Sequence, residues 1–232
     1  ATCHPASSAV PSPVAPPTVA SSAIRSATVR RNSHPPERAD PLTPSRCGRM
    51  DQGCAFGDRA VLMEFDGDRL STEEIRPAKD LHFVIVDLKA KKDTVEILKR
   101  LNRSYPFAEG EVERGVQELL GPVNKRIVQQ AKEALQAGDA ERLGALMSEA
   151  QTFFDRYAAP ACPEELEAPV LHRVLAHEAL RPHVWGGKGV GSQGDGSAQL
   201  VARSAADQRA VVEILERDLG VAGLPLTLGT GP

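Results

Sequence analysis

The chain has 232 residues, of which 41% are hydrophobic and 25% are charged, and its formal net charge is -3. This composition is typical of a soluble globular protein with one large domain or two small ones. The negative charge, with no basic block carrying interleaved aromatic residues, argues against nucleic-acid binding. No apolar run approaches the roughly 18 residues that a membrane helix needs, so no membrane partner is expected.

The four cysteines are too few for a disulfide scaffold, and their spacing does not suit a zinc site. We therefore expect reduced thiols in a cytoplasmic compartment. The cysteines are Cys3, Cys47, Cys54 and Cys162.

Residues 1–44 differ in composition from the rest of the chain. They hold nine of the eighteen prolines and no acidic residue before Glu37. Such a segment buries too little apolar surface to offset its ordering entropy, which predicts low complexity and disorder. A Ser- and Arg-rich, acid-poor start also resembles a transit peptide, and a plastid or other organelle is therefore the alternative location. Because the chain starts at Ala1, we favour a truncated or damaged N-terminus over a targeting signal.

The first predicted strands lie at residues 60–65, followed by an Asp66-Gly67 turn, and at residues 81–88. The second is a continuous apolar run, as expected of a buried strand. Asp93 is positioned to cap a helix whose apolar side includes Ile97 and Leu101.

Helical periodicity then continues to about residue 175. The first stretch, with apolar residues between positions 112 and 120, is expected to break or kink at Gly121-Pro122. Periodicity resumes at residues 127–135, and Gly138 ends it. Asp139 caps the next helix, which has apolar residues up to Phe154. One further helix is predicted after Pro163, with apolar residues up to Leu175.

The C-terminal part returns to β character. Strands are predicted at residues 182–185, 198–202 and 224–228, with a helix over residues 205–219 that is capped near Ser204. The order β, helices, β, glycine loop, β, α, β predicts an α+β fold, with helices packed on one face of an antiparallel sheet.

Residues 186–196 hold six glycines between hydrophobic segments. A glycine cluster marks backbone that adopts positive φ or approaches another group closely. Turns of backbone N–H groups without side chains form concave anion sites, most often for phosphate. The alternative on these residues alone is an exposed loop between two strands.

The sequence CGRMDQ at residues 47–52 resembles the C-G-x-M-D-Q motif of the sugar-kinase branch of the GHMP kinases. The glycine cluster lies where that superfamily has its C-terminal glycine-rich motif, and the order of the two motifs is similar. The resemblance covers residues 44–228. It implies a ferredoxin-like α+β C-terminal domain at residues 81–230. It also implies part of a ribosomal-S5-like N-terminal α/β domain at residues 45–80.

The resemblance implies roles for two acidic residues and one lysine. Asp51 would be the general base that accepts the proton of the attacking hydroxyl. Without the resemblance, Asp51 would be interpreted as a helix N-cap or part of a surface ion pair. Lys188 would belong to the substrate site and offer a positive charge to a phosphate, its alternative being an exposed lysine. Asp195 would either touch a substrate hydroxyl or hold a turn.

The glycines and an upstream serine pair would bind the nucleotide. By resemblance, the glycine cluster shapes the phosphate pocket, chiefly through Gly187, Gly189, Gly191 and Gly194. The family's phosphate loop binds ATP with backbone amides and Mg²⁺ with a serine. Its nearest match here is at Ser21 and Ser22, with Ser22 as the metal ligand, and it lacks the family's glycines.

The sequence thus predicts an ATP- and Mg²⁺-dependent kinase that phosphorylates a hydroxyl of a sugar or related small molecule. The Met-Asp-Gln motif favours a sugar over mevalonate or homoserine. The alternatives are a catalytically inactive or fragmentary kinase that acts as a binding module, and a mevalonate-type kinase. Neither the acceptor nor the oligomeric state can be read from the sequence.

Overall fold

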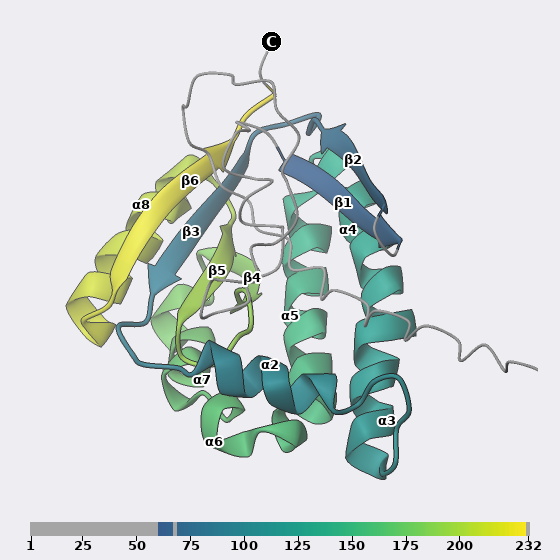
Figure 1. The fold of residues 1–232 in the computed structure, drawn as a ribbon. Helices are drawn as coiled ribbons and strands as arrows, with labels where there is room; N and C mark the ends of the chain where they lie inside the picture. The colour runs from purple at the N-terminus through teal and green to yellow at the C-terminus, as the bar shows by residue number, and fades with distance from the viewer. Residues whose placement is uncertain (1–59, 67–68, 231–232) are drawn as a thin grey trace, which may run out of the picture.

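A computed structural model describes residues 60–66 and 69–230. Figure 1 shows the arrangement of these residues around one four-stranded sheet. Residues 1–44 and the predicted site residues Ser21, Ser22 and Asp51 lie outside the described part of the chain.

The main sheet is antiparallel and has the strand order β4-β5-β3-β6. The central strand β3 (Leu81–Asp87) pairs with β5 (Ser197–Ala202) on one side and with β6 (Ala222–Leu228) on the other. The edge strand β4 (Val184–Gly189) pairs with β5. The predicted antiparallel sheet and its α+β class are confirmed, because these four segments all supply strands to it.

A separate two-stranded ribbon precedes the sheet. It joins β1 (Ala60–Asp66) to β2 (Arg69–Ile75). The first strand was expected and the second was not. β2 is polar, and only Ile75 of its seven residues is fully buried. A strand of this kind lacks the apolar alternation by which sequence patterns reveal strands.

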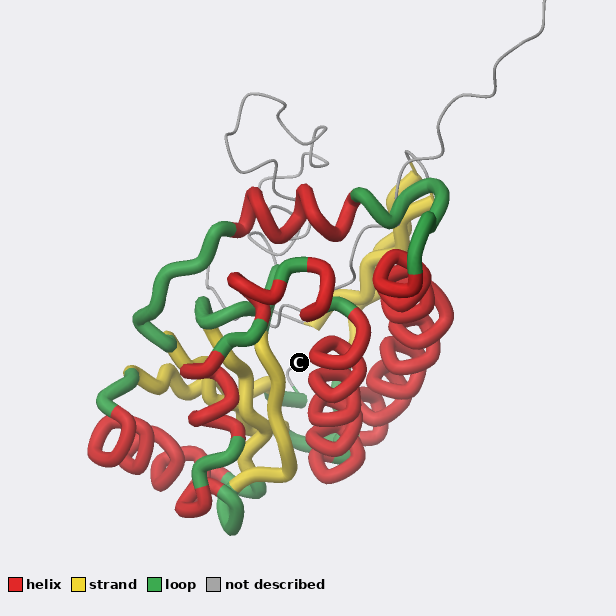
Figure 2. Tube along the Cα trace, turned by 90° about the horizontal axis from the view of Figure 1, so that it is seen from below, coloured by secondary structure: helices red, strands yellow, loops and turns green. Residues whose placement is uncertain are grey.

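Helices cover both faces of the main sheet, which corrects the expected one-sided packing. On one face, Val84, Val86 and Leu200 join a core cluster with α7 (Pro169–Leu175) and α8 (Ala205–Ile214). On the other face, Phe83 and Val201 join a cluster with α4 (Asn124–Ala137) and α5 (Ala140–Tyr157). Viewed from below, the strands lie between these two sets of helices (Figure 2). Successive residues of β3 and β5 point to opposite faces, so each strand contributes to both clusters.

The helical stretch before α4 continues through Gly121-Pro122, so the first of the two expected outcomes, a break, does not occur. α3 (Glu111–Glu118) runs into a π-helical turn at Leu119–Val123, which contains Pro122, and then into α4. Proline removes one helical N–H donor and crowds the carbonyl one turn earlier. A wider π turn accommodates both effects without ending the helix.

The single helix expected after Pro163 is instead two short helices. α6 (Pro163–Leu166) ends before α7 begins, and Ala168 between them has a φ of 47°. The residue before a proline is disfavoured in the right-handed helical region, so Pro169 separates the two helices. Short 3₁₀ turns at Ala159–Ala161 and Glu178–Leu180 flank this region.

The predicted caps are confirmed at three helices. Asp93 caps α2 (Thr94–Asn102), Asp139 caps α5 and Ser204 caps α8, each by accepting a backbone N–H with its side chain. α8 continues as a π-helical turn (Leu215–Leu219) that ends at Gly220, in the left-handed region.

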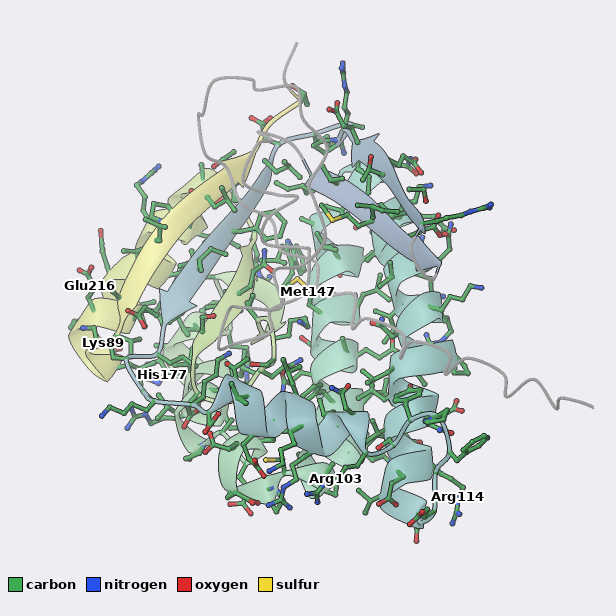
Figure 3. All side chains as sticks on the ribbon, in the orientation of Figure 1. Lys89, Arg103, Arg114, Met147, His177 and Glu216 are labelled. Atoms are coloured by element: carbon green, nitrogen blue, oxygen red, sulfur yellow. The ribbon has the colours of Figure 1, made fainter. Side chains whose placement is uncertain are left out.

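Side chains hold this end of α8 against the rest of the fold. Lys89 Nζ donates a hydrogen bond to the carbonyl oxygen of Gly220, at 3.1 Å, and His177 Nε2 lies 3.3 Å from a carboxylate oxygen of Asp218. Figure 3 shows Lys89 and His177 in this region.

α5 packs directly along the outer edge of β4. A Cβ atom added to Gly144 of α5 would lie 2.5 Å from Cβ of Trp185 and 2.9 Å from the backbone nitrogen of Gly186. A Cβ atom on Gly186 would in turn meet the backbone of Gly144 and the hydroxyl of Ser148. The helix and strand approach this closely only because both residues lack side chains.

α5 also satisfies the hydrogen-bonding groups of this sheet edge. The backbone N–H of Gly187 donates to Ser148 Oγ at 3.3 Å, and that of Gly189 donates to Gln151 Oε1 at 2.7 Å. Unpaired N–H groups at a sheet edge invite association with other chains. Two side chains of α5 accept hydrogen bonds from these N–H groups, so another strand cannot pair with them at the edge of β4.

We expect Gly144→Ala to destabilise the fold by about 1–3 kcal/mol, because the added methyl group forces α5 away from a backbone that cannot move aside. Ala145→Ser is the matched control: it adds one heavy atom to an exposed neighbour on the same helix, and we expect a change of about 0.5 kcal/mol or less. Urea unfolding of both variants measures the difference. Equal stability of Gly144→Ala and Ala145→Ser would contradict the close contact.

Candidate functional site

The predicted glycine loop is a strand followed by a turn. Gly187 and Gly189 belong to β4, which corrects their assignment to a loop, while residues 190–196 connect β4 to β5. A Cβ atom on Gly187 would lie 2.5 Å from a methyl group of Leu200, and one on Gly189 would lie 2.6 Å from Gln193 Oε1. Both glycines therefore allow the protein's own side chains to approach the strand.

The turn at residues 190–196 contains three residues with positive φ. Gly191, Gln193 and Gly194 have φ values of 68°, 65° and 66°. The turn closes through hydrogen bonds from the N–H of Val190 to the carbonyl of Ser197 and from the N–H of Gln193 to the carbonyl of Val190. Left-handed residues within a turn are one element of the backbone concavities that bind anions in proteins.

Lys92 packs onto this turn from the segment after β3. Its Nζ donates to the carbonyl oxygen of Gln193 at 2.9 Å. A Cβ atom on Gly196 would lie 2.8 Å from that Nζ, so the glycine makes room for the lysine. Burial lowers the pKa of Lys92 below its ordinary value. Sequence patterns do not reveal this contact, because a lysine in a polar run carries no signal of its tertiary partner.

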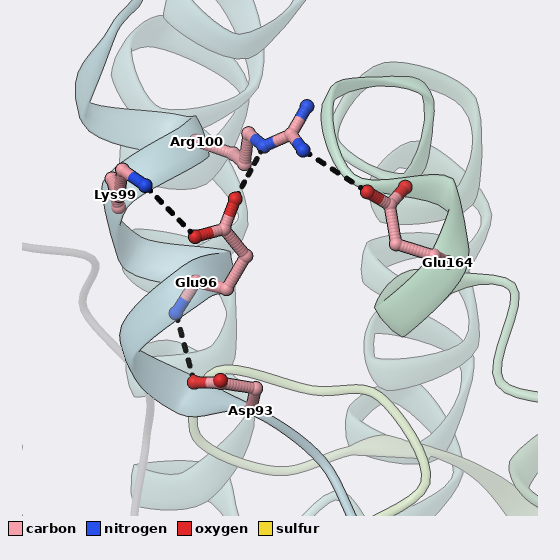
Figure 4. A network of polar contacts seen from close by, with 5 residues as sticks. All are labelled: Asp93, Glu96, Lys99, Arg100 and Glu164. Atoms are coloured by element: carbon pink, nitrogen blue, oxygen red, sulfur yellow. Dashed lines mark hydrogen bonds and ion pairs between the residues drawn. The ribbon is translucent and has the colours of Figure 1, made fainter.

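α2 is fastened to α6 by a polar network, shown in Figure 4. Glu96 accepts hydrogen bonds from Lys99 and from Arg100, whose guanidinium also reaches Glu164 at 3.1 Å. The Asp93 N–H donates to Glu165 at 2.8 Å. These contacts fix the start of α2, and with it Lys92, beside the turn.

Asp195 and Gly194 attach the other side of the turn to the helices. Asp195 Oδ1 accepts a hydrogen bond from the N–H of Leu171 at 2.8 Å, in the first turn of α7. A Cβ atom on Gly194 would lie 2.7 Å from the carbonyl oxygen of Glu165. Of the two roles open for Asp195, the structure thus shows a turn-holding contact.

Lys188 lies in β4, one residue from the edge contacts with α5. It is half-buried, and its Nζ donates to the carbonyl oxygen of Gly189 at 2.6 Å. Burial lowers its pKa to about 8. Its cross-strand partner in β5 is Gln199.

The edge strand also connects to a polar chain on α5. Gln151, which accepts the N–H of Gly189, donates its amide to Asp155 Oδ1 at 2.8 Å. Asp155 lies 3.4 Å from His172 Nε2 on α7. Sequence patterns missed Gln151, since a glutamine within a helix gives no sign that it faces a sheet edge.

Within the described ranges, no group of three or more His, Cys, Asp or Glu side chains is arranged to hold a metal ion. No helix there combines the length and apolar character needed to cross a bilayer. Of the predicted site residues, the structure brings Gly187, Gly189, Gly191, Gly194, Asp195 and Lys188 together on one hairpin.

Comparisons of sequence found no matching family model and no matching curated protein. Comparison of structure found similar solved proteins, among them three kinases. The mevalonate kinase of L. major in complex with R-mevalonate matches with a TM-score of 0.61 and 22% identity, over 81% of this chain and 53% of that one. The phosphomevalonate kinase of Streptococcus pneumoniae in complex with phosphomevalonate and AMPPNP has a TM-score of 0.57 and 16% identity, over 76% and 54%. The galactokinase of Lactococcus lactis complexed with galactose has a TM-score of 0.51 and 16% identity, over 75% and 51%.

The chain therefore spans about half the length of the solved kinases it matches. At these identities the similarity establishes the fold, while function has to be argued from sites. All three proteins are GHMP kinases, as the motifs at residues 47–52 and 186–196 implied. The described part of this chain has the GHMP kinase fold.

Proposed function

We propose that the chain acts as an ATP-dependent kinase that transfers the γ-phosphate to a hydroxyl of a sugar or related small molecule. One conjunction carries the proposal: the CGRMDQ motif at residues 47–52 precedes β1, which begins at Ala60, in a chain with the GHMP kinase fold. Residues 45–80 would belong to the N-terminal domain and residues 81–230 would form the C-terminal domain. Localisation in the cytoplasm belongs to the same proposal.

The proposed chemistry assigns the proton transfer to Asp51. Its carboxylate would orient the acceptor hydroxyl and accept its proton as the oxygen attacks the phosphorus atom. Catalysis of phosphoryl transfer rests mainly on positioning and on stabilisation of charge, and a well-placed general base contributes about 10²–10⁴-fold.

The described residues suit the anionic part of a nucleotide or substrate. The positive-φ residues of the turn supply the backbone geometry, and Lys188 supplies a half-buried cation. Asp195 would contact the substrate through the carboxylate oxygen that is not bonded to Leu171. Ser21 and Ser22 would contact the nucleotide, with Ser22 as the ligand of Mg²⁺, whose charge offsets that of the phosphates.

Two alternatives rest on specific observations. The serine pair lacks the glycines that let backbone approach phosphate, which favours an inactive kinase-like binding module. The similarity to the mevalonate kinase of L. major supports a mevalonate-type kinase instead of a sugar kinase. The acceptor that is phosphorylated distinguishes these possibilities.

The first experiment measures Mg²⁺- and ATP-dependent release of ADP with monosaccharides, uronic acids and mevalonate as acceptors. We expect turnover with one acceptor class, and a loss of about 10²–10⁴-fold in Asp51→Asn because the base is removed. Asp80→Asn is the matched control. Asp80 accepts the N–H of Thr230 on the surface, and asparagine preserves that acceptor.

Full turnover in a folded Asp51→Asn protein would remove Asp51 from the mechanism. No turnover with any acceptor, from wild-type protein that unfolds cooperatively, would reject the kinase and leave the binding module.

Two substitutions of Asp195 distinguish its effect on stability from its effect on substrate binding. Asp195→Ala removes the acceptor for the Leu171 N–H and should lower the free energy of unfolding by about 1 kcal/mol. Asp195→Asn keeps an oxygen acceptor, so its stability should stay within about 0.5 kcal/mol of wild type. If the carboxylate also contacts substrate, Asp195→Asn raises KM for the acceptor several-fold. An unchanged KM would restrict Asp195 to its structural contact.

A further inference from the structure

Lys188 and Gln199 are directly opposite each other on neighbouring strands of the main sheet. The pairing of β4 with β5 places Lys188 in register with Gln199. Residues opposite each other in an antiparallel pair point to the same face, with Cβ atoms about 4.5–5.5 Å apart. Val201, two residues along β5 from Gln199, belongs to the cluster with α5, so this is the α5 face of the sheet.

Gln199 carries a buried donor without a partner. The residue is 3% exposed, and its Nε2 makes no hydrogen bond within the described structure. Buried polar groups in folded proteins are nearly always hydrogen-bonded, and an unpaired one lowers stability. The described residues thus leave this amide donor unsatisfied.

Lys188 is a half-buried cation that has hydrogen-bond donors to spare. Its ammonium group has three donors, and among the described residues its one hydrogen bond goes to the carbonyl of Gly189. No carboxylate in the described ranges forms an ion pair with it. Burial lowers the pKa of this ammonium group to about 8.

Packing against α5 holds the backbone beneath these two side chains in place. Ser148 and Gln151 bind the N–H groups on either side of Lys188. Gly186 and Gly144 bring the helix into contact with the strand close by. The donors are therefore mounted on a rigid element, as a binding site requires.

We propose that Lys188 Nζ and Gln199 Nε2 together bind one oxyanion group, a carboxylate or a phosphoryl group, of a small ligand. The identity of the ligand rests on the proposed kinase function. The group would be either a phosphoryl group of the nucleotide or an acidic group on the acceptor. The charged ammonium would give most of the affinity, and the amide would fix the orientation of the second oxygen.

The test measures binding to the full chain by titration calorimetry, with turnover excluded by omitting ATP. The probes are pyrophosphate, as the phosphoryl source, and galacturonate with galactose as its neutral counterpart. Lys188→Met and Gln199→Met remove one donor each at similar volume. Lys91→Met and Gln136→Met are matched controls, since both residues are exposed.

We expect wild type to bind pyrophosphate, or galacturonate in preference to galactose. Lys188→Met should weaken that binding at least tenfold and Gln199→Met at least threefold, while both controls stay within twofold of wild type. Loss of pyrophosphate binding assigns the pair to the nucleotide. Loss of galacturonate binding assigns it to an acidic acceptor.

A second readout separates binding from a structural role. Without probe, Lys188→Met and Gln199→Met should raise the melting temperature by a few degrees, because each removes a polar group whose loss of hydration is not fully compensated. A lower melting temperature with unchanged binding would make these residues structural and overturn the proposal.

Two further results would also overturn it: a folded wild type that binds neither probe, and a Lys188→Met protein that binds as Lys91→Met does. The kinase proposal fails separately. Oxyanion binding that depends on Lys188, with no release of ADP from any acceptor, rejects the kinase and keeps the site. Turnover that is the same in Lys188→Met as in wild type keeps the kinase and rejects the oxyanion site.

Discussion

The packing of α5 against the edge of β4 is the contact on which the rest of the hairpin depends. Two glycines, Gly144 on the helix and Gly186 on the strand, let the two backbones meet without intervening side chains. Ser148 and Gln151 then bind the N–H groups that an edge strand leaves unpaired. Steric fit and hydrogen bonding thus act on the same few residues, and the position of β4 follows from both.

This contact determines where the turn at residues 190–196 lies, and three other elements hold it there. Lys92, which lies just before the cap of α2, donates a hydrogen bond to the carbonyl of Gln193. Asp195 accepts one from the first turn of α7, and Gly194 lies against the carbonyl of Glu165. A glycine-rich turn is intrinsically mobile, because glycine has the largest conformational freedom to lose. In this protein that freedom is restricted from several sides, so the turn is held in one arrangement.

Several polar groups of the hairpin hold its backbone against α5, α2 and α7. Lys188 and Gln199, on the strand pair itself, have donors that the described residues do not use. Gln193 Oε1 in the turn is also buried without a partner among the described residues. Proteins tolerate such a departure from full hydrogen bonding mainly at functional positions, where stability is given up for binding. The contrast distinguishes one face of the β4–β5 pair within a fold shared with the GHMP kinases.

Local chemistry determined much of what the sequence by itself predicted. The apolar run of β3, the caps at Asp93, Asp139 and Ser204, and the motif at residues 47–52 each depend on neighbouring residues, so the order of amino acids alone reveals them. Contacts between distant segments decided the remainder. A run of glycines does not say whether it is a loop or, as at Gly186–Gly189, a strand pressed against a helix, because a missing side chain leaves no pattern and only the neighbour explains it. The roles of Lys92 and Gln151 were hidden for the same reason: a polar side chain reveals its partner only when the fold brings that partner beside it.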